Sequence, residues 1–258
     1  MAVAGHPQQM AGDPRSAVAE TRGPGQLWPD PSWVVAGMAT TATTSVEDRK
    51  RLVRRLVARS RGFAEEYGFQ VTNNPASLFQ VLCLAILLRR TGDVRRAVEP
   101  ARALRDAGWE SPARMARART EARAAVLREH GRSADADRLA GTLGELAEAL
   151  VARYRGDLRR LRAAARHAPA RERALLAELP GVDAEVVELF LREVQALWAE
   201  TAPVADRRAL AAARRLGLGR SAADLATLAG GGESEKLAWL VGTLARIDLE
   251  DRYHEIAR

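Results

Sequence analysis

The stretch that decides the fold runs from Ala174 to Leu218 and reads ALLAELPGVDAEVVELFLREVQALWAETAPVADRRALAAARRLGL. Its apolar residues recur at three- and four-residue spacing, which predicts helices. Pro180 and Gly181 end the first helix, and Asp206 precedes the third. The sequence therefore predicts two short helices joined by a tight turn, a short break and then another helix.

A hairpin of this kind has a physical use. Two short helices that meet at a glycine turn leave several backbone N–H groups pointing outward. Together with the positive end of the second helix, these groups favour a phosphate. They require no particular base, so such an element can hold a DNA strand without reading its sequence. On spacing alone, a helix N-cap is the favoured explanation of Asp206.

Helical patterns continue on both sides of this stretch. Further helices are expected over 46–68, 77–88, 94–107, from 113, and over 121–129, 135–154, 157–166, 221–228 and 235–246. The segment 77–88 is apolar throughout, which predicts a helix buried on all sides. No stretch alternates long enough to predict a strand. The expected fold class is all-α.

Residues 1–44 have a different composition. This Pro-, Gly- and Thr-rich segment cannot bury a core and is predicted to be a disordered tail. Trp28 and Trp33 stand out in it, as an anchor for a partner or as a short ordered patch. The folded domain is expected over 45–258.

Composition narrows the functional classes. The 258 residues carry a formal net charge of +7, with Lys50 and Lys236 as the only lysines. Such a charge suits an anionic partner, although an arginine-rich composition explains it as well. Cys83 is the only cysteine, which excludes an intramolecular disulfide and any four-cysteine zinc or iron–sulfur site.

Other signals are missing from the sequence. The four histidines show no metal-ligand spacing, so no metal or cofactor is expected. No apolar run approaches the length of a membrane span, and no export signal is recognisable. We therefore expect a cytoplasmic protein with no membrane partner.

The motifs LLAELPGV and VADRRALAAARRLGL, in this order, resemble the helix-hairpin-helix (HhH-GPD) DNA glycosylases of the endonuclease III superfamily. The resemblance covers roughly residues 74–218 and is greatest to a branch without the iron–sulfur cluster. It implies a two-lobed fold. Lobe one would span approximately 74–205 and contain the hairpin, and lobe two would combine 45–73 with 206–258.

The resemblance also assigns roles to residues. Asp206 matches the catalytic aspartate, which stabilises a cation-like sugar while the bond to a flipped-out base breaks. Leu179, Pro180, Gly181 and Val182 match the DNA-binding hairpin. The implied partner is double-stranded DNA, bound by a monomer.

Arg89 and Arg90 are expected in a loop that runs to Asp93. By the resemblance, this loop lies where relatives insert a residue into the base stack. The two arginines are therefore a candidate wedge or phosphate clamp, or simply a solvated basic loop.

Two departures from the superfamily pattern concern charge. Glu185 stands where bifunctional members carry the lysine that attacks the sugar, so a lysine-driven lyase is not expected. Asp183 replaces the second glycine of the hairpin. Both carboxylates would face the phosphate, and like charges at short range reduce affinity.

Three classes of function remain open on the sequence. The first is a monofunctional DNA base-excision repair glycosylase. The second is a catalytically silent DNA-binding protein derived from one, which the acidic residues at the hairpin favour. The third is a helical protein-interaction module, for which the tryptophans of the tail are the only support.

Overall fold

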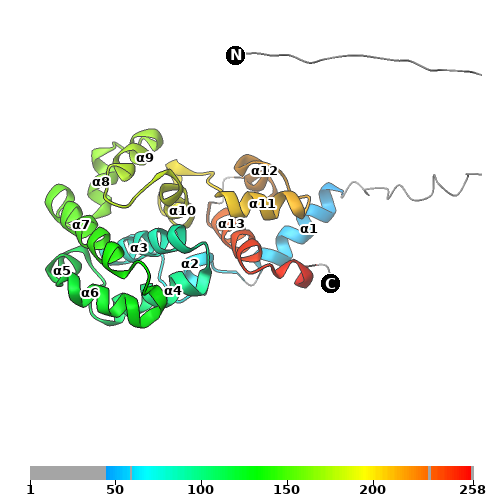
Figure 1. Cartoon of the computed structure of the whole chain (residues 1–258). Coiled ribbons are helices and arrows are strands. Elements are labelled where there is room, and N and C mark those ends of the chain that lie inside the picture. The colour runs from blue at the N-terminus through cyan, green and yellow to red at the C-terminus, as the bar shows by residue number, and fades with distance from the viewer. Residues whose placement is uncertain (1–44, 59, 232–233, 257–258) are drawn as a thin grey trace, which may run out of the picture. The chain divides into compact units, whose positions relative to one another are not determined.

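The computed structural model describes residues 45–58, 60–231 and 234–256, which belong to one compact unit from Thr44 to Arg258. The disordered tail predicted over 1–44 lies outside the described residues, as do its two tryptophans. Every regular element in the described ranges is a helix, which confirms the predicted all-α class (Figure 1).

The elements are short and follow one another closely. In chain order they are α1 (Val46–Val57), α2 (Phe63–Glu66), α3 (Pro75–Thr91), α4 (Val94–Asp106), α5 (Pro112–Arg117), α6 (Thr120–Leu127), the π-helical turn η2 (Arg128–Arg132), α7 (Ala136–Tyr154), α8 (Leu158–Ala164), α9 (Pro169–Ala177), α10 (Ala184–Val194), the 3₁₀ turn η3 (Ala199–Thr201), α11 (Arg207–Arg215), α12 (Ala222–Leu228), α13 (Ser234–Leu249) and the 3₁₀ turn η4 (Arg252–Glu255).

The helices pack in two groups that meet at α10 (Figure 1). Helices α3 to α9 pack mainly against one another, whereas α1, α2, α11 and α12 pack against α13. Helix α10 contacts α3 and α9 in the first group and α13 in the second. The buried apolar side chains of both groups form one continuous core. The hairpin helix α10 is therefore the element through which the two groups are joined.

Helix α3 is the central buried helix that the sequence predicts. Asn74 caps it by accepting a hydrogen bond from the Ser77 amide at 2.9 Å, and Pro75 occupies its first turn. Nearly every side chain from Ser77 to Leu88 is buried, including the single cysteine. Within the described ranges, no helix is both long and apolar enough to cross a bilayer.

The prediction that Arg89 and Arg90 lie in a loop is wrong, because α3 continues through both residues to Thr91. Two cationic side chains in the last turn interact favourably with the negative end of the helix dipole. Gly92 then ends the helix in the left-handed conformation, with φ at 60°. The two arginines are therefore presented by a rigid helix end.

The single helix expected over 46–68 is also divided. Ser45 caps α1 by accepting a hydrogen bond from the Asp48 amide at 3.1 Å. The helix ends at Val57, and α2 starts only at Phe63, after Gly62 with φ at 94°. Helix α13 occupies the space beside this break, which explains why an uninterrupted helix does not form here.

Gly242 of α13 makes this close approach feasible. A Cβ atom at Gly242 would lie 2.5 Å from the backbone nitrogen of Phe63, closer than any Cβ contact can be. We expect Gly242→Ala to lower the free energy of unfolding by about 2 kcal/mol, because backbone would have to shift. Gly141→Ala in α7 is the matched control, since a Cβ there meets nothing within 4 Å. Chemical denaturation should show the control unchanged or slightly more stable.

Candidate functional site

The predicted hairpin is formed by α9, α10 and the turn between them. Gly181 adopts φ of 77°, and a Cβ there would lie 2.4 Å from Cγ2 of Thr142 on α7. Both properties require glycine. Leu179 and Val182, on either side of the turn, are buried in the core. Their side chains fix the turn, so any contact to a DNA strand would have to come from its backbone.

Asp183 begins α10 as its N-cap. Its Oδ1 accepts a hydrogen bond from the Val186 amide at 2.9 Å. The backbone amides of the first turn of a helix have no intrahelical acceptors, and they carry the positive end of the helix dipole. Asp183 thus satisfies one amide and places a negative charge beside the others.

Arg89 offsets that charge. Its Nε lies 3.1 Å from Oδ2 of Asp183 and 3.1 Å from Oε2 of Glu185, so one guanidinium bridges the two carboxylates. All three side chains are partly exposed, and each pair alone contributes little to stability. Arg90, the next residue on α3, is exposed and is not part of this bridge. The unfavourable pair of carboxylates expected from the sequence is therefore partly neutralised within the chain.

Asp206 is buried, with only 4% of its surface exposed. Its Oδ1 accepts a hydrogen bond from the Ala209 amide at 2.8 Å, which makes it the N-cap of α11. Its Oδ2 accepts a hydrogen bond from Nη1 of Arg192 on α10. Both oxygens of the predicted catalytic carboxylate therefore have structural partners.

Arg192 is the centre of a buried charge network that no sequence pattern predicted. Its Nε donates to Oε1 of Glu193 at 2.6 Å, and its guanidinium lies over the Phe63 ring at 4.6 Å. Oε2 of Glu193 accepts the Ala64 amide of α2 at 2.8 Å. Burial acts to lower the pKa of Arg192, but Asp206 and Glu193 raise it on balance. The network joins α10, α11 and α2 through charges that compensate one another.

Two ion pairs hold the start of α11 against α10. Arg192 pairs with Asp206, and Glu185 lies 3.4 Å from Nη2 of Arg207. Glu185 and Arg192 are two turns apart on α10, which corresponds to roughly 10 Å along the helix. Asp206 therefore contacts the last turn of α10, and the hairpin turn lies beyond the N-terminal end of the same helix.

The structure thus brings some of the predicted residues together and separates others. Arg89, Glu185 and Arg207 form one partly exposed cluster at the N-terminal end of α10, and Asp206 lies behind it in the core. Arg90 stays outside the cluster. The sequence contained one signal for the buried network: Arg192 interrupts the apolar residues of α10, where a charged side chain is unusual.

No protein-family model matches this chain, and a search of curated proteins finds no significant match. The residues and their geometry are therefore the basis for any proposal about function.

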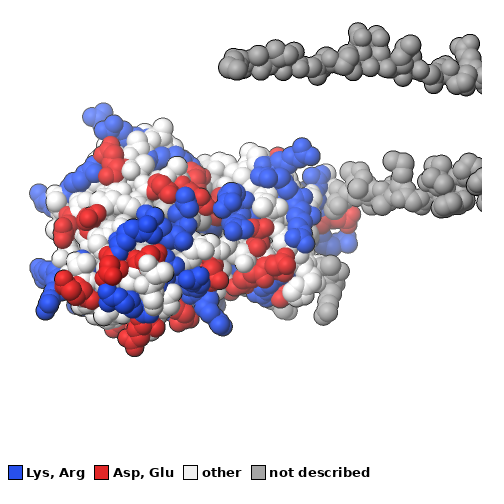
Figure 2. All heavy atoms as spheres, in the orientation of Figure 1, with Lys and Arg blue, Asp and Glu red and all other residues white. Residues whose placement is uncertain are grey.

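A second basic feature lies at the far end of α11. Arg49, Arg214 and Arg220, with Gly217 and Gly219, line an open hollow of about 510 Å³. Over the face shown in Figure 2, basic side chains alternate with acidic ones. The positive charge is thus spread in several small groups, each of which could contact a phosphate.

Proposed function

We propose that this chain is a DNA base-excision repair glycosylase that acts on duplexes with a damaged or mismatched base, as a monomer and without a cofactor. The observation that carries the proposal is the attachment of the α11 N-terminus to the hairpin helix α10. Two ion pairs attach the start of α11 to this helix: Arg207 pairs with Glu185 in the first turn of α10, and Asp206 pairs with Arg192 in its last turn.

The chemistry that this arrangement could perform has two parts. Backbone amides at the Gly181 turn and at the start of α10 would hold a phosphate of the strand. Asp206 would stabilise positive charge on the sugar of a flipped-out nucleotide while water replaces the base. Arg192 supplies the buried counter-charge of this carboxylate.

A lysine nucleophile is not part of the proposal. Glu185 stands at the position of that lysine and is engaged with Arg89 and Arg207. Lys50 pairs with Glu47 on α1, and Lys236 lies on α13. Hydrolysis of the glycosidic bond without strand cleavage is therefore the proposed outcome.

The decisive experiment compares Asp206→Asn with Arg192→Met on duplexes that carry deaminated, oxidised, alkylated or mismatched bases. Both variants lose the same ion pair, but only Asp206→Asn loses the carboxylate. If Asp206 acts on the sugar, base release should fall at least a hundredfold in Asp206→Asn and much less in Arg192→Met. Circular dichroism should first show that both variants are as helical as the parent at the assay temperature.

The enzymatic proposal fails if the unsubstituted protein releases no base from any of these duplexes while an active glycosylase does so in parallel. Equal losses in the two variants would assign Asp206 a structural role only.

A second candidate, a catalytically silent DNA-binding protein of the same architecture, is favoured by one observation. Asp206 is almost inaccessible, and both of its oxygens are already occupied. A nucleotide could reach it only if the start of α11 moved away from α10. Unchanged DNA affinity in Asp206→Asn, with no product from either protein, would establish this function instead.

Both candidates make the same prediction for the acidic residues of the hairpin. Glu185→Gln should increase affinity for duplex DNA about two- to fivefold, because one negative charge beside the phosphate site disappears. Glu188→Gln is the matched control, since Glu188 is a similarly exposed residue of α10 that pairs with Arg173. Fluorescence anisotropy at several salt concentrations measures the effect, which should shrink as salt screens the charge. Equal effects of the two substitutions would place the DNA elsewhere.

A further inference from the structure

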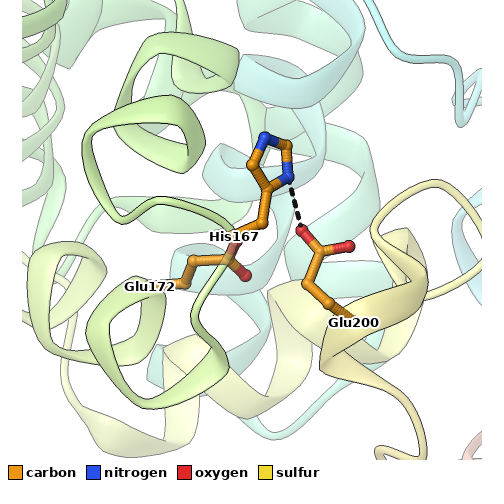
Figure 3. Close-up of side chains that lie close together, drawn as sticks. All are labelled: His167, Glu172 and Glu200. Carbon is orange, nitrogen blue, oxygen red and sulfur yellow. Dashed lines mark hydrogen bonds and ion pairs between the residues drawn. The ribbon is translucent and has the colours of Figure 1, made fainter.

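A second cluster of ionisable side chains comes from the residues around the start of α9 and after the end of α10, at the open end of the hairpin. It combines His167 from the turn between α8 and α9, Glu172 from α9 and Glu200 from η3 (Figure 3). One ligand atom from each residue lies within 4.8 Å of the other two. A nitrogen and two carboxylate oxygens are a donor set that divalent transition metals prefer.

Glu172 is the unusual member of the cluster. It is completely buried, and neither of its carboxylate oxygens has a hydrogen-bond partner among the described residues. A buried carboxylate without a partner is strongly unfavourable, so it requires either a proton or a cation. Figure 3 shows that the Glu172 carboxyl points into the space between the other two side chains.

His167 is directed toward the same space. Its Nδ1 lies 3.2 Å from Oε1 of Glu200. The residue and its neighbour Arg166 both have φ of 55°, a left-handed conformation that is unfavourable for a side chain with a Cβ. The backbone of this turn therefore adopts an uncommon geometry that brings the imidazole to Glu200.

Arg162 limits what Glu200 can bind. Its Nε donates to Oε1 at 2.6 Å and its Nη2 donates to Oε2 at 2.7 Å. A carboxylate offers about four acceptor positions, so this pair still leaves positions on both oxygens. The acceptor site on Oε1 that faces His167 is the one that a cation bound between the two residues would occupy. The positive charge of Arg162 lowers the affinity for a cation, whereas the charge of Glu172 raises it.

We propose that His167, Glu172 and Glu200 bind one divalent cation of the zinc class, through Nδ1 of the imidazole and one oxygen of each carboxylate. Zinc bonds of about 2 Å in a tetrahedral site place neighbouring ligand atoms about 3.4 Å apart. Nδ1 of His167 and Oε1 of Glu200 are already close to this spacing, at 3.2 Å, and the Glu172 carboxylate lies within 4.8 Å of both. A water molecule would complete the four ligands.

The cation would connect three segments of the chain. It would tie the α8–α9 turn and α9 to η3, which lies in the connection between α10 and Asp206. The site is formed without any residue of the proposed DNA contact. Its presence or absence is therefore independent of whether the chain binds DNA.

Protonation of the Glu172 carboxyl is the alternative explanation for its burial without a partner. Burial, together with the neighbouring Glu200, raises the pKa of Glu172 to about 7, whereas the hydrogen bonds from Arg162 lower the pKa of Glu200. A protonated Glu172 can donate its hydroxyl to Glu200. The two explanations differ in whether a metal ion binds at all.

The test uses the full chain, purified without a histidine tag and freed of metal with EDTA. Isothermal titration with Zn²⁺ at pH 7.5 should show one ion bound per chain with a micromolar or lower dissociation constant. Mg²⁺ should bind far more weakly, because it prefers oxygen ligands and retains its waters. Saturating Zn²⁺ should raise the melting temperature by several degrees.

Variants identify the ligands. His167→Ala and Glu172→Gln should each weaken Zn²⁺ binding at least tenfold and remove the rise in melting temperature. His254→Ala is the control, because His254 is exposed and lies 4.0 Å from Glu255 on η4. Co²⁺ provides a second readout, since its visible absorption should appear with the parent chain and be lost with His167→Gln.

The proposal is overturned if no saturable binding is observed, or if His167→Ala and Glu172→Gln bind Zn²⁺ as the parent does. Either result would assign Glu172 a proton in place of a metal ion.

Discussion

Replacing Arg192 with methionine is expected to lower the free energy of unfolding by about 3–5 kcal/mol, the largest effect of any single substitution considered. The guanidinium is 1% exposed and is the counter-charge for Asp206 and Glu193, which are also buried. Methionine fills much of the same volume but leaves two carboxylates without compensation. Urea or guanidinium denaturation of the full chain at pH 7 measures the loss.

A double-mutant cycle separates the charge effect from packing. Asp206→Asn retains an oxygen that can accept the Ala209 amide, so α11 remains capped while one negative charge is removed. The double variant, Arg192→Met with Asp206→Asn, should therefore lose less than the sum of the two single variants. Additive losses would mean that Arg192 contributes mainly through its contact with Phe63.

Replacing Glu172 with glutamine is expected to stabilise the protein by about 2 kcal/mol more at pH 8 than at pH 5, with both values measured in EDTA. Since its pKa of about 7 exceeds the usual 4.5, the folded chain binds more protons than the unfolded chain between these values. Stability from Glu172 is therefore complete below pH 4.5 and is lost as the pH rises through 7. Glutamine carries no charge at any pH and escapes this loss.

Glu200 does not obscure this effect. Its pKa is lowered, mainly by Arg162, so its contribution to stability is complete above the usual value of 4.5 and stays constant from pH 5 to 8. Glu145→Gln, at an exposed position of α7, is the control and should show no such dependence. A stability difference between Glu172→Gln and the parent that is the same at pH 5 and pH 8 would contradict the prediction.

Local patterns in the sequence predicted much of the fold. The apolar run of α3, the cap Asp206 and the turn at Gly181 were all recognisable, because each depends on residues within a few positions of one another. The errors also have a physical cause. The helix expected over 46–68 is divided because α13 packs against the break, and no local pattern contains that contact.

The sequence by itself determined the all-helical class, the hairpin and the position of Asp206 at a helix start, since helix spacing and capping are short-range properties. Only the tertiary structure decided which charges meet. It placed Arg192 on Asp206, Arg89 between Asp183 and Glu185, and Glu172 beside Glu200. Each of these pairings joins segments that are far apart in the sequence, so it is set by packing of the whole chain. At Arg192 and Glu172, burial also strengthens the charge interactions.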